Sequence, residues 1–503
     1  MSHDTANRAV RNVFFSGIRL SVSMGSTICT SAIVARTLGP ANMGVYGYAM
    51  WLVGTLGILA NIGLPAALTK YISEYVGRGD TVTAAQLGKR LLFMQLALAA
   101  GVSGLTACFV FIRSPYRSVI GLAAVMLFAQ ALQQSLGAAL AGVQRFDRMA
   151  LISIYVALAS LASIGVAAVL HAGVMGMLWA TLAGLSVTIW LYYRAVDEFL
   201  LKLSPRPPNP SPPAPDIFRR IRKFSLTISY ILLLDAIVWQ RSEVLFLKWY
   251  STLPQIAFYT LAYSIASKLS DVASTFSSTL LPIYSESYGR SGLRDVRPVF
   301  ENALKYLQML MVPLCLLGVA IAKPMVQLIY GQNFLPLVLP LQFLILTQAF
   351  TSTGVVQSPL VVGTEKQSFI AKWGTVVAAL NIALDLILIP RQGALGAAAA
   401  NCIAQFIGVL GGTFYTIRLV GISFPWKTTG TIYAAAAIAL APVAYLGNRT
   451  HSGIAVLVAF LAVGTLLYLG LLVVAGQFGR RDLGVLKQAL LTKVYPAEPL
   501  EVV

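Results

Sequence analysis

Charge is scarce in this sequence, and acidic charge most of all. Only 11% of the 503 residues are charged, and 37 Lys and Arg outnumber 18 Asp and Glu. In an ordinary soluble domain about 25% of the residues are charged. The shortage therefore excludes a typical soluble fold, and the hydrophobic fraction of 57% indicates a membrane protein instead.

Histidine and cysteine are also few. The sequence contains 3 His, at a terminus and in two expected loops, and 4 Cys, all in apolar segments. Cysteine in such segments behaves as a small hydrophobic residue, so no disulfide framework is predicted. Because no His or Cys spacing in the sequence is typical of a metal site, we predict neither a protein metal site nor a bound cofactor.

Long apolar segments follow one another from the N-terminus to about residue 476. Each is long enough to cross a hydrocarbon core, which needs roughly 20 apolar residues of helix. We therefore predict an all-α, polytopic membrane protein with about fourteen transmembrane helices. The expected spans are 12–36, 43–69, 86–112, 118–142, 149–170, 173–193, 224–247, 255–283, 301–322, 334–362, 369–390, 394–417, 428–447 and 452–476.

Lys and Arg are unevenly divided between the two sides of the expected membrane. The N-terminus and the loops on its side hold most of them, among them Arg8, Arg90 and Arg220, whereas the other loops hold few. Since cytoplasmic loops carry the excess of Lys and Arg, both termini are predicted to be cytoplasmic. The same distribution accounts for the formal net charge of +19. Basic residues spread over many loops are topology signals, so no nucleic-acid partner is predicted.

A proline-rich, basic stretch divides the sequence. Residues 204–215 are dense in proline and precede the basic cluster Arg219–Lys223, a composition typical of a semi-rigid linker. We expect two pseudo-symmetric six-helix lobes followed by two C-terminal helices. The expected parts are an N-lobe at 1–196, a cytoplasmic linker at 197–223, a C-lobe at 224–420, the last two helices at 421–478 and a cytoplasmic tail at 479–503.

The two halves share short motifs in the same order. At an offset of about 220 residues, Gly142–Phe146 resembles Gly363–Gln367, and Gly173–Met177 resembles Gly393–Ala397. Small-residue turns can recur by chance, but their matching order and spacing favour an internal duplication. Duplicated bundles are a common plan for transporters, with the substrate path between the halves.

Ionisable residues inside the expected spans are the first candidates for function, because a charge at mid-bilayer costs about 2.5–3.5 kcal/mol or more. The basic ones are Arg19, Lys268 and Arg241, and the acidic ones are Asp235, Glu243, Asp271 and Asp385. The three cations lie at successive depths and would form a cationic ladder in a shared cavity. Snorkelling is the alternative for both arginines, and an ion pair with Asp271 is the alternative for Lys268. We interpret Asp385 as structural.

Hydroxyl and charged side chains form a stripe along two expected helices. The first stripe is Asn12, Ser16, Arg19, Ser23, Ser26 and Thr30, and the second is Thr260, Ser264, Ser267, Asp271, Ser274 and Ser278. Steps of three and four residues place each stripe on one helix face. We predict that both faces line a hydrated cavity, with Ser16, Ser23 and Ser267 beside the basic residues. The alternative is that small residues let helices pack closely.

Several motifs carry a resemblance to a known family. They are Val34–Gly47, Gly63–Pro65, Tyr71–Glu74, Leu328–Gly331, Gly363–Gln367 and Ile389–Ala397. In this order, and with the expected number of spans, the chain resembles the polysaccharide-transporter branch of the multidrug/oligosaccharidyl-lipid/polysaccharide flippase superfamily. That branch contains oligosaccharide-lipid flippases, and the resemblance covers nearly the whole chain.

The resemblance implies two lobes around a central cavity and transport of lipid-linked oligosaccharides, typically on undecaprenyl diphosphate. Transport would run from the inner to the outer leaflet of a bacterial cytoplasmic (inner) membrane. In the related lipid II flippases, cavity arginines hold the diphosphate; Arg19 matches the first-helix position, and Lys268 stands where an eighth-helix arginine would be. A second-helix match is missing, so the resemblance in these residues does not extend to lipid II as the substrate. The last two helices would offer a groove for the lipid tail.

The sequence therefore predicts a flippase for cell-surface polysaccharide biosynthesis, working by alternating access through a cationic cavity. H⁺ or Na⁺ coupling would use Asp235, Asp271 or Glu243. Membrane lipids are expected partners, and polysaccharide polymerase and glycosyltransferase machinery are candidate partners. The main alternative is a drug or metabolite antiporter of the multidrug-extrusion type, which predicts an acidic cavity. An enzyme is not predicted, because the outer loops are short and almost free of catalytic carboxylates.

Overall fold

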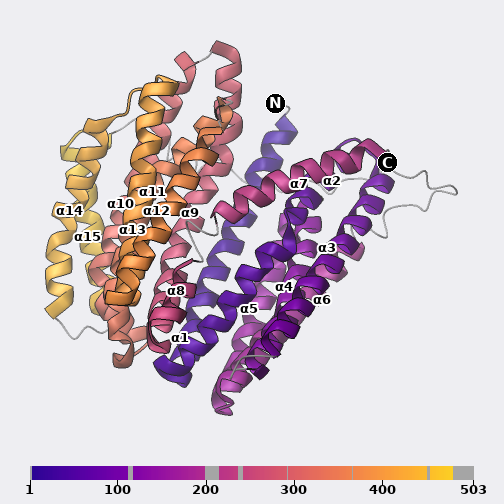
Figure 1. The fold of residues 1–503 in the computed structure, drawn as a ribbon. Coiled ribbons are helices and arrows are strands. Elements are labelled where there is room, and N and C mark those ends of the chain that lie inside the picture. The colour runs from indigo at the N-terminus through magenta and orange to yellow at the C-terminus, as the bar shows by residue number, and fades with distance from the viewer. Residues whose placement is uncertain are drawn as a thin grey trace. The chain divides into compact units, whose positions relative to one another are not determined.

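The structure, a computed structural model, describes residues 3–111, 117–198, 215–235, 242–291, 293–364, 366, 368–449 and 454–479. In this part of the chain every regular element is a helix (Figure 1). Nine stretches of the described residues are long and apolar enough to cross a membrane: Gly17–Asn61, Thr81–Cys108, Arg117–Gly142, Phe146–Val169, Gly173–Val196, Val296–Ile329, Gln332–Gly363, Ser368–Gln392 and Ala394–Arg418. The predicted all-α polytopic membrane protein is confirmed.

The chain forms two compact units. The first takes in Met1–Leu38 and Val45–Ala236, and the second takes in Gly39–Gly44 and Ile237–Leu491. The helices that build the first unit are α1 (His3–Asn61), α2 (Leu64–Gly77), α3 (Thr81–Phe111), α4 (Arg117–Gly142), α5 (Phe146–Val169), α6 (Gly173–Val196) and α7 (Pro215–Asp235). Residues 224–235, expected at the start of the C-lobe, are thus the end of α7 and belong to the first unit.

The second unit contains the remaining described helices. They are α8 (Ser242–Tyr250), α9 (Leu253–Ser291), α10 (Leu293–Ile329), η3 (Gln332–Leu337), α11 (Val338–Gly363), α12 (Ser368–Gln392), α13 (Ala394–Tyr415), η4 (Thr416–Val420), α14 (Trp426–Arg449) and α15 (Ile454–Val474). Every expected span has a counterpart among the helices of the two units. The proline-rich residues 204–214 lie outside the described residues.

Breaks in the helical backbone lie between the first two expected spans and inside the second one. Within α1 the backbone leaves helical geometry at Gly39, where φ is 69°, and Pro40 follows. A second break lies at Ile62 and Gly63, with φ of 37° and 64°. Glycine adopts positive φ without a steric penalty, and proline is suited to the first turn of a helix, which is where Pro65 stands in α2. The second expected span, 43–69, therefore consists of the end of α1 and the first part of α2, and α2 continues to Gly77.

In each expected repeat, the second shared motif begins with a glycine in a left-handed turn. Gly173 precedes the body of α6 with φ of 62°, and Gly393 precedes α13 with φ of 55°. Both positions need the left-handed backbone that glycine adopts readily. This shared local geometry supports the duplication inferred from Gly173–Met177 and Gly393–Ala397.

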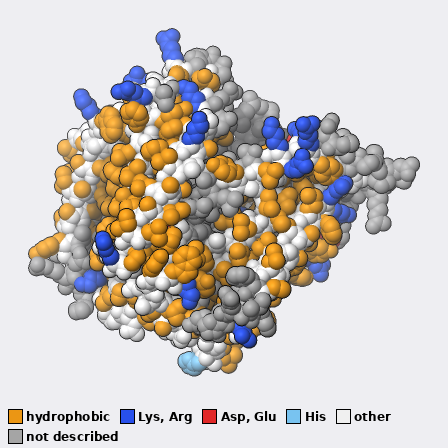
Figure 2. All heavy atoms as spheres, viewed as in Figure 1, with side chains coloured by type: hydrophobic (Ala, Val, Ile, Leu, Met, Phe, Trp, Pro, Cys, Tyr) orange, Lys and Arg blue, Asp and Glu red, His pale blue; other side chains and the backbone are white. Residues whose placement is uncertain are grey.

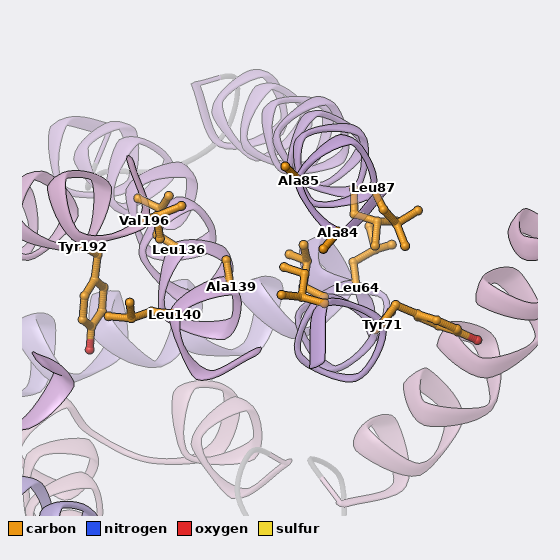
Figure 3. Packing of buried hydrophobic residues seen from close by; sticks show 14 of the residues in the cluster. Leu64, Tyr71, Ala84, Ala85, Leu87, Leu136, Ala139, Leu140, Tyr192 and Val196 are labelled. Carbon is orange, nitrogen blue, oxygen red and sulfur yellow. The ribbon is translucent and has the colours of Figure 1, made fainter. Parts of the chain in front are cut away.

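The core of the first unit lies among α2, α3, α4 and α6. Leu68 and Ile72 of α2 and Leu87 of α3 are fully buried, and Leu140 of α4 packs in the same cluster with Tyr192 of α6. Figure 3 shows this packing, with side chains from the four helices turned toward one another. Because lipid tails are as apolar as these side chains, close van der Waals packing between the helices stabilises such a core.

In the second unit, α14 and α15 pack onto α10. Val312 of α10, Ala436 of α14 and Leu472 of α15 are fully buried in one cluster, and the Tyr468 hydroxyl donates to the Met309 carbonyl at 3.2 Å. The outer surface of the helices is mostly hydrophobic, with few acidic side chains in view (Figure 2). Large exposed side chains such as Leu105 and Val169 are suited to contact with lipid tails.

Candidate functional site

A buried polar cluster lies in the second unit, where α8, α9, α12 and α13 meet. Its acidic members are Glu243 in the first turn of α8 and Asp385 in α12, and both are 0% exposed. A buried charge without compensation is strongly unfavourable, so two buried carboxylates in one cluster need a specific explanation.

Helical spacing aims the amide side chains at these carboxylates. Asn381 and Asp385 are four residues apart on α12, and Asn401 and Gln405 are four residues apart on α13, so each pair shares one helix face. All four residues are buried, although both helices are long and apolar enough to cross a membrane. The two polar faces meet the first turn of α8, which carries Glu243.

Hydrogen bonds link the cluster into one network. Asn401 Nδ2 donates to Glu243 Oε1 at 2.8 Å, and Gln405 Nε2 donates to Asn401 Oδ1 at 2.6 Å. Asp385 Oδ2 accepts from Ser242 Oγ at 3.0 Å and from Asn381 Nδ2 at 3.3 Å. Asn381 Nδ2 also lies 3.5 Å from Glu243 Oε1, so it lies between the two carboxylates.

Five buried oxygen atoms of this cluster have no hydrogen-bond partner among the described residues. They are Glu243 Oε2, Asp385 Oδ1, Asn381 Oδ1, Gln405 Oε1 and the Tyr259 hydroxyl of α9. The Tyr259 hydroxyl lies beside the Glu243 carboxylate and is a hydrogen-bond donor within its reach. Neither carboxylate forms an ion pair with a described Lys or Arg. Unpartnered buried oxygens are rare in folded proteins, and oxygen donors are the preferred ligands of hard cations. The cluster is therefore suited to holding a small cation or a shared proton.

The cluster differs from a His or Cys metal centre. Among the described residues, no group of three or more His, Cys, Asp or Glu side chains could hold a metal ion. Two ionised carboxylates carry two negative charges, so one monovalent cation would balance the cluster only when one of the two carboxyl groups is protonated.

The predicted cavity residues of the first helix lie on the surface of the first unit. Arg19 and Ser23 are exposed on α1, and the Arg19 side chain reaches the hydroxyl of Tyr192 in α6. Two threonine hydroxyls bond to carbonyls of the stripe residues on α1: Thr27 Oγ1 donates to the Ser23 carbonyl and Thr30 Oγ1 donates to the Ser26 carbonyl. These threonine hydroxyls are satisfied within α1, so they do not tie this face to another helix.

The predicted residues of the eighth span lie on α9. Lys268 Nζ is 3.2 Å from Asp271 Oδ2, which confirms the alternative that these two residues pair. Ser267 Oγ donates to the Ser264 carbonyl at 3.1 Å. One turn away, Ser270 Oγ donates to Gln348 Oε1 of α11. Lys268 is thus held in a polar patch, although its charge is shared with a carboxylate.

Three predicted site positions fall outside the described side chains. They are Arg241, and the side chains of Ser16 and Asp235. Arg19 belongs to the first unit and Lys268 to the second, and each is described within its own unit. The cationic ladder therefore stays a prediction.

Sequence reasoning included Glu243 among the coupling candidates but missed the residues around it. It assigned Asp385 a structural role, whereas the structure places Asp385 in the same network as Glu243. The available signal was the pair of four-residue polar spacings, Asn381 with Asp385 and Asn401 with Gln405, inside apolar spans. Polar pairs on one face of a membrane helix point to a shared buried site.

Comparison with known proteins gives the family. Residues 33–339 match the family described as Polysaccharide biosynthesis protein. The chain belongs to this family. No curated protein matches the chain. The predicted relationship to polysaccharide transporters is confirmed.

Solved structures show the same fold for this polysaccharide biosynthesis family member. Lipid II flippase MurJ, in an inward closed conformation, matches with a TM-score of 0.69 and 15% identity over 94% of this chain and 99% of the MurJ chain. An inward-facing multidrug resistance MATE family transporter of the MOP superfamily matches with a TM-score of 0.61 and 17% identity, over 80% and 98%. A MOP superfamily transporter from Pyrococcus furiosus matches with a TM-score of 0.53 and 14% identity, over 82% and 95%.

Proposed function

We propose that this protein is a flippase that moves a lipid-linked oligosaccharide from the inner to the outer leaflet of a bacterial cytoplasmic membrane. The supporting observation is the family match over residues 33–339, whose description is polysaccharide biosynthesis. The likeness to lipid II flippase MurJ extends this support, because it covers 94% of this chain. The carrier in this proposal is a polyprenyl diphosphate of the undecaprenyl type.

The head group would be held by basic side chains of the predicted cavity. A diphosphate is anionic, and a guanidinium binds phosphate through two parallel hydrogen bonds, a role that suits Arg19 and Arg241. Lys268 would act as a point charge, with Ser16, Ser23 and Ser267 offering hydroxyl donors. The exposure of Arg19 on α1 supports this role, because a ligand can reach its guanidinium.

Flipping would be coupled to a cation through Glu243 and Asp385. Their unpartnered oxygens support this proposal more directly than Asp271, which already pairs with Lys268. A proton or Na⁺ entering the cluster would neutralise part of the buried negative charge and stabilise one arrangement of α8, α12 and α13. Release of the cation on the other side would reset that arrangement, as a two-state transporter requires.

The substrate implies partner enzymes. Glycosyltransferases must build the oligosaccharide on its lipid before flipping, and a polymerase or ligase must consume it afterwards. We propose that the protein works beside such machinery and carries out no bond chemistry of its own.

Complementation tests the flippase proposal. The wild-type chain, expressed in a bacterium that lacks its own oligosaccharide-lipid flippase, should restore surface polysaccharide on a gel. Arg19→Ala should abolish rescue at equal abundance, because the diphosphate loses its bidentate partner. Arg148→Ala is the matched control, since Arg148 is exposed and pairs with Glu198 at 3.5 Å, and it should rescue fully. Full rescue by Arg19→Ala would contradict the proposed head-group site.

The likeness to MATE transporters favours one competing function, drug or metabolite antiport. That function predicts resistance to cationic dyes and efflux of these dyes, with no restored polysaccharide. The flippase proposal predicts the reverse pattern in the same strains. Dye efflux that depends on Glu243, joined to failed complementation, would replace the flippase by the antiporter.

A further inference from the structure

Helix α7 has two unlike faces. Ile217, Ile221 and Ser225 follow one another at four-residue steps and are buried, with exposed fractions of 4%, 3% and 4%. Ile217 and Ile221 join the core cluster of the first unit, and Phe218 and Phe224 pack against it. One side of α7 is therefore fixed to the body of the first unit, which leaves the residues between these positions on its outer side.

The outer side of α7 is basic. Arg219, Arg220, Arg222 and Lys223 are all exposed. Arg220 lies 3.8 Å from Glu74, but Glu74 is closer to Arg78 at 2.5 Å, so one carboxylate serves two guanidiniums. Within the part of the chain that the structure describes, Arg219 and Arg222 make neither an ion pair nor a hydrogen bond.

The neighbouring helices add more cations to the same surface. Arg90 of α3 lies over the Phe218 ring at 4.2 Å, and Lys70 of α2 lies over the Phe224 ring at 4.2 Å. Lys89 is exposed beside Arg90. Figure 2 shows Lys and Arg side chains gathered over the region that α7 and α2 occupy in Figure 1. We call Lys89, Arg90, Arg219 and Arg222 the basic ledge.

Exposed apolar side chains begin directly beside the basic ledge. On α7, Leu226 is 56% exposed, four residues beyond Arg222, and on α3, Phe93 is 72% exposed, three residues beyond Arg90. Both helices thus change from cationic to apolar within one turn, as happens where a protein surface passes from head groups to hydrocarbon. An acidic protein or a nucleic acid would match only the cations, whereas a phospholipid matches both parts.

We propose that the basic ledge binds the head group of an anionic phospholipid of the inner leaflet, with acyl chains lying along Phe93 and Leu226. Clusters of Lys and Arg at the cytoplasmic end of a membrane helix attract anionic lipids. The lipid would attach the N-terminal part of α7 to the membrane surface. This site does not depend on the transported substrate. The lipid-binding proposal can therefore be tested independently of the proposed flippase function.

Lipid titration of the purified full-length protein tests the proposal. Dioleoyl phosphatidylglycerol binding would be read by native mass spectrometry, with dioleoyl phosphatidylcholine as the neutral probe and inorganic diphosphate as a competitor that lacks acyl chains. The Arg219→Gln/Arg222→Gln variant should bind phosphatidylglycerol about 25-fold more weakly, at about fivefold for each cation. Inorganic diphosphate should not displace the lipid at equal concentration.

A matched double variant separates this site from a general effect of positive charge. Arg145→Gln/Arg148→Gln removes two arginines of the same unit that are paired with Asp147 at 3.0 Å and with Glu198 at 3.5 Å. This control should keep wild-type lipid affinity, and thermal melting should show that both variants are folded. Equal loss in both variants, equal binding of phosphatidylcholine, or tighter binding of poly-glutamate than of phosphatidylglycerol would each overturn the proposal.

Discussion

At the scale of single residues, two buried carboxylates are the main candidates for cation coupling. Glu243 and Asp385 share the amide of Asn381, and each keeps one buried oxygen without a partner among the described residues. Amides of this kind stabilise negative charge only in part, because they supply dipoles and no counter-charge. In the proposed mechanism, a monovalent cation or a proton would interact with these unpartnered oxygens.

Glu243→Gln should uncouple transport from the cation. The substitution keeps the shape of the side chain and removes its negative charge. If Na⁺ drives transport, Na⁺ should no longer raise the melting temperature of the variant. If protons drive transport, a protonophore should no longer inhibit transport by the variant. Transport should fall at least tenfold. Thermal shift and a flipping assay in proteoliposomes measure both effects.

Glu198→Gln is the control for this experiment, because Glu198 is an exposed glutamate whose side chain is 55% exposed and pairs with Arg148. It should leave transport and cation response unchanged. A Glu243→Gln variant with wild-type cation response would show that coupling uses other groups, with Asp235 as the next candidate.

The sequence could indicate single charged residues in the spans, but it could not indicate which of them meet. Glu243 was accessible to prediction because it is a carboxylate inside an apolar segment. Its grouping with Asp385 depends on how α8, α12 and α13 pack. The spacing of residues within one helix does not predict contacts between residues 138 or more positions apart. Pairing of Lys268 with Asp271 was accessible, since both lie on one helix turn.

At the scale of elements, the breaks in helices decide where side chains are placed. Gly63 ends the break between α1 and α2 with φ of 64°, and a Cβ atom added there would lie 2.5 Å from the Ser225 carbonyl oxygen of α7. A glycine at this position therefore serves two needs, the left-handed backbone and the close approach of α7 to α2.

Gly63→Ala should destabilise the first unit by about 1–3 kcal/mol, because the new methyl group forces α7 away from α2. Gly79→Ala is the matched control: Gly79 has φ of 78° but open space around its Cβ position. Gly79→Ala introduces backbone strain without a steric clash. The melting temperature should therefore fall less in Gly79→Ala than in Gly63→Ala. An equal fall in melting temperature in both variants would show that the close approach of α7 to Gly63 contributes nothing to the stability of the first unit.

Helix positions were largely predictable from apolar length, and helix breaks were not. The expected span 224–247 is in fact the end of α7 and most of α8, with residues 236–241 outside the described part. Apolar content alone does not distinguish a straight span from two shorter helices. The assignment of α7 to the first unit follows from Ile217 and Ile221, whose four-residue spacing extends the helix into the basic cluster.

At the scale of the whole molecule, the proposed substrate would move charge across the membrane. A diphosphate head group carries about two negative charges, and each gains roughly 2.3 kcal/mol per 100 mV when it moves out of a negative interior. A cation moving inward through the Glu243 cluster would be driven in the same sense by the same potential.

An imposed inside-negative potential of about 100 mV should shift the lipid-linked oligosaccharide toward the outer leaflet by roughly 5 kcal/mol of driving force. Proteoliposomes with a potassium gradient and valinomycin allow this measurement, and reversing the gradient is the internal control. A distribution that is the same at both polarities would contradict transport of the dianion.

The two units of this chain hold pieces of each other's sequence. Gly39–Gly44 lies within α1 yet belongs to the second unit, where a Cβ atom on Gly44 would lie 2.0 Å from the Leu253 carbonyl oxygen, and α7 follows the linker yet belongs to the first unit. Duplicated halves joined end to end could be inherited or exchanged separately. Here a recombination event at the linker would separate each unit from a part of itself.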